Sequence, residues 1–399
     1  MIHLDRRAFF TLVGGGASAL AAGCKRAASG DAIPALDAGP ARFTEKVADL
    51  VLHTDRPPNL ETPLRYFRTD ITPNDAMFVR WHLSGLPLSI DVRAWRLRLE
   101  GHVDEALSLS LDDLRAMESV SVVAVNQCSG NSRALFAPRV PGVQWARGAI
   151  GNAKVTGVRL KDLLAKAGVR SGARDVTFRG LDRAPRESVP AFVKSLEIDR
   201  TGDPDVIVAY AMNDAPLPLL NGFPARLVVP GWFSTYWVKA LTEIRVLDAP
   251  FDGYWMAKAY RIPKTPGADE SPADLAKETV PISKMNVRSL IVRPEPDETL
   301  AAGRAYEVEG LAFDGGAGIK RVEVSTDGGT TWSEARLDAD LGRYSWRRWR
   351  ATWTHPTEGN HAILARATSN DGEEQRATPQ WNRAGYMRNV FERTDVRVT

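Results

Sequence analysis

Cysteine is scarce in this sequence. Its 399 residues contain two, Cys24 and Cys128, and Cys24 lies in a segment typical of export signals. Cys128 therefore has no partner for a disulfide bond in the mature chain. A lone thiol also excludes structural zinc sites and iron–sulfur clusters, which use several Cys or His ligands. No Cys-x-x-Cys-His motif is present, so haem attached through cysteines is excluded as well.

Neither sign of charge dominates, and long hydrophobic runs are missing. The 52 Lys and Arg residues nearly balance the 49 Asp and Glu residues, for a net charge of +3. This balance gives no support to nucleic-acid binding, which calls for a basic domain or stripe. Beyond the export segment, no apolar run is long enough to span a bilayer. Hydrophobic (44%) and charged (25%) fractions are those of a soluble globular protein, and the length predicts two domains.

The first residues predict export rather than fold. A twin-arginine pattern at residues 5–10 precedes a short run rich in Gly and Ala, so residues 1–24 are expected to direct a folded protein to the periplasm. The five residues that end at Cys24 also resemble a lipobox, which leaves two alternatives: acylation of Cys24 as a membrane anchor, or cleavage elsewhere. Residues 25–60 have no clear period and are expected to form a leader or linker.

Residues 61–280 alternate strands with short helices. A short strand at residues 77–82 places Arg80 and His82 on one face, because side chains two apart point the same way. Residues 158–168 have an apolar stripe at helical spacing and end in glycine, which predicts a helix. The pattern favours an α+β domain with a mixed sheet over a regular parallel array.

Residues 281–399 have a different character. Apolar and polar side chains alternate at residues 304–310, 319–325 and 361–367, and turns rich in Gly and Asp separate these segments. Alternation at period two, repeated between such turns, predicts a β-sandwich of immunoglobulin size.

Cys128 follows a run of β-branched residues at the point where a buried strand should end. A turn containing Gly130 comes next, and Arg133 lies five residues beyond the thiol. Three interpretations remain open from the residues alone: a buried structural thiol, a ligand for a thiophilic metal, or a nucleophile with His82 as its base.

Four arginines support an anion pocket. Arg80, Arg133, Arg226 and Arg343 are each expected at a strand end or turn. The planar guanidinium group donates two hydrogen bonds to two oxygens, which suits tetrahedral oxyanions. Taken singly, each is equally well explained as a surface residue; together with an unpaired thiol they indicate an anion site.

From about residue 62 to the C-terminus the sequence resembles the sulfite oxidase family of mononuclear molybdenum enzymes, in particular the bacterial periplasmic sulfite dehydrogenases. Its 127–133 segment, Gln-Cys-Ser-Gly-Asn-Ser-Arg, is similar to the family's cysteine loop. The other matching segments are 78–82, Trp145 with 147–150, 180–182, 212–218, 222–226, 229–231, 238–239, Tyr260 and 342–346.

The resemblance implies a role for each matched residue. Cys128 would be the protein's ligand to molybdenum, alongside a single molybdopterin. The residues implied to line a sulfite and sulfate pocket are Arg80, Arg133, Trp145, Tyr260 and Arg343. The residues implied to hold the cofactor are Arg80, His82, Cys128, Asp182, Asn221, Arg226 and Lys239.

The chain also departs from the family's pattern. Asn221 stands where the animal enzymes carry a histidine, and Tyr236 and Trp237 replace a frequent Arg-His pair. These changes bear on single contacts to the pterin. No haem-binding domain is expected at either end of the chain.

The resemblance implies a homodimer that oxidises sulfite to sulfate and passes electrons to a separate acceptor, a periplasmic c-type cytochrome. Alternatives within the superfamily are a sulfane dehydrogenase and a sulfoxide reductase, although the latter would normally lack the sandwich. An alternative of another class is a lipid-anchored binding protein without redox chemistry. Cys128 argues against it, because a binding protein does not need that thiol.

Overall fold

The computed structural model describes residues 43–354 and 356–399. All of them belong to one compact unit of the chain. The predicted export signal at residues 1–24, including Cys24, lies outside the described residues. Within the described part, no helix is both long enough and apolar enough to cross a membrane.

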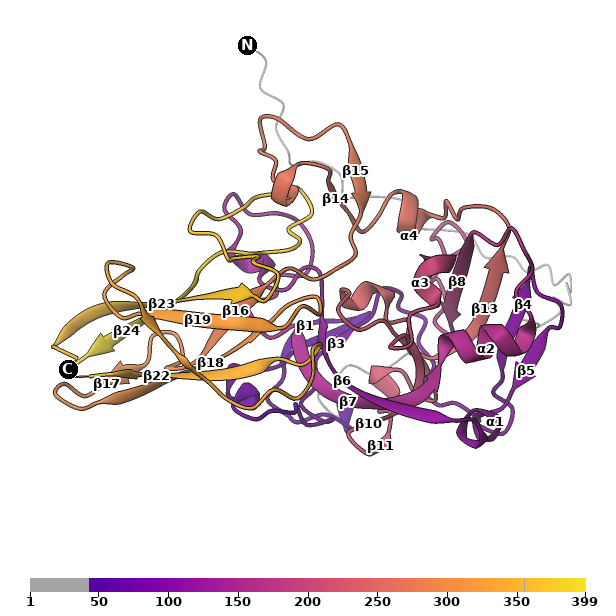
Figure 1. Ribbon diagram of the computed structural model, residues 1–399, viewed down its shortest axis with the longest axis horizontal. Helices are drawn as coiled ribbons and strands as arrows, with labels where there is room; N and C mark the ends of the chain where they lie inside the picture. Colours follow the sequence, from indigo (N-terminus) through magenta and orange to yellow (C-terminus); the bar gives the residue numbers. More distant parts are fainter. Residues whose placement is uncertain (1–42, 355) are drawn as a thin grey trace, which may run out of the picture. The chain divides into compact units, whose positions relative to one another are not determined.

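Three sheets organise the residues before position 250 (Figure 1). The first joins β1 (Val51–Asp55), β2 (Pro58–Glu61) and β3 (Val79–Arg80). The second is antiparallel and has the order β11 (Ala215–Pro216), β10 (Ile207–Met212), β7 (Ile150–Arg159) and β6 (Ser119–Gln127), with β12 (Arg226–Val228) also on β10. The third has the order β5 (Leu107–Leu109), β4 (Leu97–Gly101), β13 (Leu241–Leu247), β8 (Asp175–Gly180) and β9 (Val193–Glu197). Since β13 runs parallel to β4 and antiparallel to β8, the predicted mixed sheet is confirmed.

Helices are short in the described residues and lie between these strands. Helix α1 (Leu111–Ala116) begins at Ser110, whose hydroxyl accepts from the Asp113 amide while the Asp113 carboxylate accepts from the Ser110 amide. Helix α2 (Leu160–Ala167) ends at Gly168 with a φ of 67°, as the terminal glycine predicted. The remaining elements are α3 (Ile198–Thr201), α4 (Tyr254–Ala257) and the 3-10 turns η2 (Leu64–Phe67), η3 (Arg133–Leu135), η4 (Leu219–Asn221), η5 (Ser234–Tyr236) and η6 (Pro266–Ala268).

A two-layer β-sandwich follows the hairpin of β14 (Arg261–Pro263) and β15 (Thr279–Pro281). One layer has the order β16 (Arg288–Arg293), β18 (Tyr306–Phe313), β22 (Arg347–Trp353) and β21 (Arg336–Leu337). The other has the order β17 (Thr299–Leu300), β24 (Glu392–Val398), β23 (Gly359–Ser369), β19 (Ile319–Ser325) and β20 (Ser333–Glu334). Strand β24 alternates strictly between buried and exposed residues, so the predicted sandwich is confirmed.

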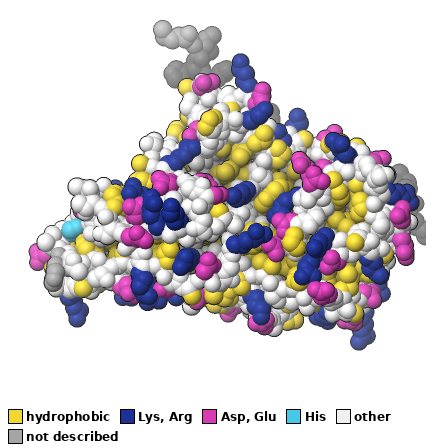
Figure 2. All heavy atoms as spheres, viewed as in Figure 1, with side chains coloured by type: hydrophobic (Ala, Val, Ile, Leu, Met, Phe, Trp, Pro, Cys, Tyr) yellow, Lys and Arg dark blue, Asp and Glu magenta, His cyan; other side chains and the backbone are white. Residues whose placement is uncertain are grey.

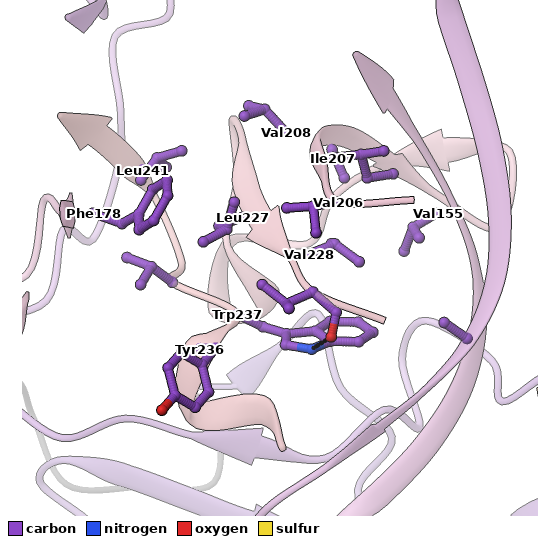
Figure 3. Close-up of a cluster of buried hydrophobic side chains, with 14 of the residues drawn as sticks. Val155, Phe178, Val206, Ile207, Val208, Leu227, Val228, Tyr236, Trp237 and Leu241 are labelled. Carbon is purple, nitrogen blue, oxygen red and sulfur yellow. Dashed lines mark hydrogen bonds between the residues drawn. The ribbon is translucent and has the colours of Figure 1, made fainter. Parts of the chain in front are cut away.

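One hydrophobic core extends from the second and third sheets into the sandwich, and the first sheet packs in a separate cluster through Leu60 and Val79. The centre of the shared core packs side chains of β8, β10, β12 and β13 around Trp237 (Figure 3). Residues of the sandwich, including Leu311 and Trp346, belong to the same cluster. A second core of sandwich residues alone lies farther along the chain. The shared core ties the sandwich to the strand that carries Cys128: the Val125 amide donates to the Tyr344 carbonyl at 2.9 Å.

The face seen in Figure 2 carries basic and acidic side chains side by side, with hydrophobic side chains between them. This mixture follows from the nearly balanced composition of 52 basic and 49 acidic residues. The concentrated positive charge of this protein lies inside the fold rather than on that face.

Replacing Trp346 with alanine should destabilise the whole described fold. Trp346 is 1% exposed and meets Phe67 edge to face with ring centroids 5.5 Å apart, so truncation leaves a cavity where the sandwich joins the core. We expect a loss of about 3–5 kcal/mol in the free energy of unfolding, measured by urea denaturation. Leu341→Ala is the control, because Leu341 is 40% exposed and its loss should change stability by less than about 0.5 kcal/mol. Equal effects of the two substitutions would contradict this account.

Candidate functional site

Cys128 lies where β6 ends. Its amide donates to the Ala149 carbonyl at 2.9 Å, and its own carbonyl accepts from the Asn131 amide at 2.9 Å, so the backbone turns immediately after the thiol. The residue is 5% exposed and its thiol is free. Within the described residues, no group of three or more His, Cys, Asp or Glu side chains could hold a metal ion. A metal at Cys128 would therefore need ligands from a cofactor.

The loop after Cys128 closes on the guanidinium of Arg133. A Cβ atom at Gly130 would lie 2.3 Å from Arg133 Nη2, so only glycine leaves room for the side chain at its present position. The guanidinium donates to the carbonyls of Val143 at 2.9 Å and Ala384 at 3.2 Å. Arg133 is consequently clamped and 7% exposed, close to the thiol that precedes it.

A first pocket opens beside Cys128, and three basic side chains line it: Arg80, Arg226 and Lys239. No carboxylate is among its lining residues. The lining residues are Phe78, Arg80, His82, Asn126, Cys128, Ser129, Leu220, Asn221, Arg226, Ser234, Thr235, Lys239 and Tyr260. Such an arrangement attracts an anion, because nothing in the pocket neutralises the three cations.

Backbone carbonyls rather than acids hold these cations. Arg226 donates to the carbonyls of Asn221 at 2.9 Å and Trp237 at 3.1 Å, and the Lys239 ammonium donates to the Arg80 carbonyl at 2.6 Å. Burial lowers the pKa of Arg226 to about 9 and also lowers the pKa of Lys239. Both shifts express the cost of burying charge, which the Asp182 carboxylate offsets only in part at Lys239 and which a bound anion would reduce further.

Unpartnered polar atoms in the same pocket test whether a polar cofactor fits. Asn126 Oδ1, Ser129 Oγ, Arg226 Nε and Thr235 Oγ1 are buried and make no hydrogen bond in the described structure. Each belongs to a residue that lines the pocket. A buried polar atom without a partner is costly, so these atoms indicate a ligand rich in hydrogen-bonding groups. The donors and acceptors around Cys128 therefore fit a phosphate-bearing pterin.

His82 and Tyr260 form a buried pair at the edge of this pocket. The imidazole Nε2 and the phenol oxygen are hydrogen-bonded, and the imidazole stacks on Phe192 with centroids 3.9 Å apart. Burial, reinforced by the charges of neighbouring Arg and Lys side chains, lowers the pKa of His82 well below its usual value. Burial raises the pKa of Tyr260. The pair thus consists of a neutral imidazole and a neutral phenol at neutral pH.

A second pocket meets the first at Cys128, Arg80 and Tyr260. Its lining residues are Arg80, Cys128, Arg133, Pro141, Gly142, Val143, Tyr260, Arg383, Ala384 and Tyr386. The ring of Tyr386 is stacked parallel to that of Tyr260 at 5.5 Å, and the Arg133 guanidinium lies 5.3 Å from the Tyr386 centroid. Three arginines and no carboxylate line the pocket, so it too suits an anion. The thiol lies where the two pockets meet.

Three of the residues implied by resemblance lie outside both pockets. Arg343 needs correction: its side chain is 56% exposed and its guanidinium donates to Asp205 at 2.6 Å and to the Tyr344 hydroxyl at 2.6 Å. Trp145 is completely buried beside the cysteine loop and meets His53 edge to face at 4.8 Å. Asp182 is buried close enough to Lys239 for the two charges to interact.

The C-terminal segment brings a different arginine to the second pocket. Arg383 lines the second pocket, and its guanidinium binds the Glu270 carboxylate with nitrogen–oxygen distances of 2.9 and 3.0 Å. The sequence offered a weak indication of Arg383 and Tyr386, since both follow Trp381 in a segment without strand periodicity. Arg383 and Tyr386 were not predicted as site residues, because they lie far from Cys128 along the chain.

The departures from the family's pattern are accommodated by packing. The Asn221 carboxamide accepts from the Lys46 ammonium and donates to the Phe78 carbonyl at 3.0 Å. Lys46 is 8% exposed, and burial lowers its pKa to about 8. The Tyr236 hydroxyl donates to the Ile282 carbonyl at 2.6 Å, and the Trp237 indole donates to the Val229 carbonyl at 2.9 Å.

Lys46 was missed because it lies in the segment expected to be a leader. The described part of that segment, from residue 43, includes β1, β2 and the residues that brace the site. Glu61, at the end of β2, accepts from the amides of Ala146, Arg147 and Gly148 at 2.7–3.0 Å. Nothing in its composition marks this segment, because the contacts by which it braces the site are with distant parts of the chain.

Comparison with known proteins supports the same class of site. A model of the oxidoreductase molybdopterin binding domain matches residues 83–255, and a model of the Mo-co oxidoreductase dimerisation domain matches residues 279–399. The solved sulfane dehydrogenase SoxCD from Paracoccus pantotrophus has a TM-score of 0.74 at 24% identity, over 94% of this chain and 96% of that one. Fold and pocket together define a molybdopterin-binding oxidoreductase.

Sequence relatives narrow this class. Sulfite oxidase of Gallus gallus is 32% identical over 361 residues, covering 86% of this chain and 77% of that protein. Mitochondrial sulfite oxidase of Homo sapiens is 34% identical over 367 residues, covering 88% of this chain and 66% of that protein. This chain therefore spans 66% of the length of the human relative. It belongs to the sulfite oxidase family of molybdenum enzymes.

Acidification should weaken the fold through His82. The folded chain resists protonation of this imidazole, whereas the unfolded chain binds the proton below about pH 6.5, so lowering the pH favours unfolding. We expect the free energy of unfolding to fall by roughly 1 kcal/mol per pH unit from this residue between about pH 6.5 and 5. In His82→Gln, the free energy of unfolding measured by urea denaturation should fall less steeply as the pH is lowered over this range. If wild type and His82→Gln showed the same dependence of unfolding free energy on pH, His82 would not be its cause.

Proposed function

We propose that this chain oxidises sulfite to sulfate and passes the electrons to a separate acceptor, a c-type cytochrome. The observation that carries the proposal is the position of the free Cys128 thiol, where two cationic pockets without carboxylates meet. One pocket suits the phosphate and pterin of a cofactor, and the other suits a small oxyanion. Relatives named sulfite oxidase support this choice of substrate.

Cys128 would ligate molybdenum, and the first pocket would hold the molybdopterin through His82, Arg226 and Lys239. Arg80 and Asn221 line the same pocket, and Asp182 lies beneath Lys239, where its charge moderates that of the ammonium. When bound, the cofactor supplies the two-electron redox chemistry and the oxygen transfer. The protein contributes the thiolate, the donors and a buried site.

The second pocket would bind the substrate. Oxidation of sulfite consumes one water and releases two protons and two electrons with the sulfate. Arg80, Arg133 and Arg383 offer donors to the oxygens of both anions and stabilise negative charge during the reaction. Tyr260 lies where the pockets meet and is hydrogen-bonded to the neutral His82, so its phenol can donate a hydrogen bond to an anion bound there.

The setting of the reaction is part of the proposal. The twin-arginine pattern supports export of the folded chain to the periplasm, with acylation of Cys24 as an optional anchor. The match to a dimerisation domain supports a homodimer. Sulfane dehydrogenase activity is the alternative that the structural likeness raises, and parallel turnover assays with sulfite and with sulfane sulfur would decide between them.

Cys128→Ser should abolish sulfite-dependent reduction of cytochrome c. The wild-type chain, expressed in a host that makes the cofactor, should contain molybdenum and chain in a ratio close to unity. The serine variant should keep its fold, because Cys128 makes its structural hydrogen bonds through the backbone. Wild-type protein free of molybdenum would count against the enzyme, and turnover retained in the variant would remove Cys128 as the ligand.

Arg383→Ala should raise the KM for sulfite by roughly tenfold or more, since a charge-assisted hydrogen bond to the anion is lost. Arg343→Ala is the matched control, because this arginine is likewise exposed and paired with a carboxylate but lines neither pocket, and the KM of this variant should stay at the wild-type value. Molybdenum content should be unchanged in both variants. The reverse result would restore Arg343 to the substrate pocket.

A further inference from the structure

Lys194 is a buried cation without an acidic partner. It lies on β9 with no exposed surface, and its ammonium donates to the Trp255 carbonyl at 2.8 Å. Among the described residues, no carboxylate forms an ion pair with it. Burial alone lowers its pKa to about 7. Neither pocket is lined by Lys194, so it does not belong to the anion sites described above.

Two tyrosine rings face this ammonium. Lys194 Nζ lies 4.5 Å from the centroid of Tyr236 and 5.4 Å from that of Tyr260. A cation near the face of an aromatic ring is attracted to it, more strongly where water is excluded. Lys194 therefore contacts the ring whose hydroxyl is hydrogen-bonded to His82.

The backbone at Tyr260 needs support from its surroundings. Its φ is 55°, in the left-handed region that is unfavourable for an aromatic residue. The preceding helix α4 has four residues and no side-chain cap, so it is too short to be stable by itself. The segment 254–260 consequently depends on contacts from elsewhere in the fold.

Three main-chain carbonyls of the segment accept hydrogen bonds from donors outside it. Lys194 donates to the Trp255 carbonyl, and Arg261 donates to the Met256 carbonyl at 2.9 Å. The Ile282 amide donates to the Tyr260 carbonyl at 2.9 Å. Of these donors, Lys194 alone also contacts the Tyr260 ring, and it lies on β9 in the third sheet.

We propose that Lys194 is a positioning residue that holds segment 254–260 in place, so that the Tyr260 hydroxyl stays hydrogen-bonded to His82 where the two pockets meet. A methionine of similar length would avoid the cost of burying the charge, so retention of global stability is expected when it replaces Lys194. The role in positioning is independent of the substrate. The kinetic consequence rests on the proposed sulfite oxidation.

The test compares Lys194→Met with Lys194→Gln in the full-length holoenzyme. The methionine variant loses the donor to Trp255 and should show a kcat at least about tenfold lower, with a KM for sulfite within about twofold of wild type. Glutamine keeps a donor, and its kcat should recover to within about threefold of wild type. Lys264→Met is the control, because Lys264 is exposed and paired with Glu278, and its kinetics should not change.

Amide hydrogen exchange measures how firmly segment 254–260 is held in place, and it does not depend on turnover. In Lys194→Met, exchange should become about tenfold faster in segment 254–260, while β8 and β13 keep their wild-type protection. Exchange that rises equally in those strands would show a general loss of stability and overturn the proposal. Unchanged exchange throughout would overturn it as well. If wild-type protein failed to oxidise sulfite, the proposed function would fall and this measurement would still decide the role of Lys194.

A double-mutant cycle tests whether Lys194 acts through the phenol. In a Tyr260→Phe background, Lys194→Met should lower kcat by less than about twofold further, because the hydroxyl that it positions is already absent. If the two substitutions lowered kcat by factors that multiply in the double variant, Lys194 would act independently of Tyr260 and the proposal would be refuted.

Discussion

Positive charge buried in pockets whose lining holds no carboxylate is the constraint on which this structure depends. Arg226 and Lys239 would each be costly in an apolar interior, and the fold meets that cost with main-chain carbonyls. Because carbonyl dipoles only partly neutralise a cation, the pockets retain a strong preference for anions. Four side chains that line the cofactor pocket also keep a buried polar atom without a partner in the described structure, which a polar ligand would satisfy.

Two parts of the chain fix the position of the free Cys128 thiol. Strand β6 carries Cys128 to the end of an antiparallel ladder, and the sandwich holds that strand through Tyr344. The segment before β24 then brings Arg383 and Tyr386 to the second pocket. The sandwich is therefore part of the site and not only the part that matches a dimerisation domain.

Local patterns predicted the elements well, because hydrophobic period and turn residues act over a few positions. Helix α2 with its terminal Gly168, the strand before Cys128 and the alternation of β24 are of this kind. The short segments that match the family's motifs identified most of the residues that line the pockets, because each motif also spans only a few positions. The prediction for Arg343 was wrong in position, because neighbours along a strand or turn do not reveal which side chain reaches across to another sheet.

The sequence by itself determined that one unpaired thiol ends a buried strand beside basic residues, which already narrowed the chemistry to metal ligation, nucleophilic attack or burial. Only the tertiary structure decided which cations meet at that thiol. Lys46, Lys194 and Arg383 come from segments without motifs. Lys46 and Lys194 are buried against distant partners, and Arg383 is exposed and reaches the second pocket from the C-terminal segment. Burial and electrostatic contact depend on distance in space, and distance along the chain does not encode them.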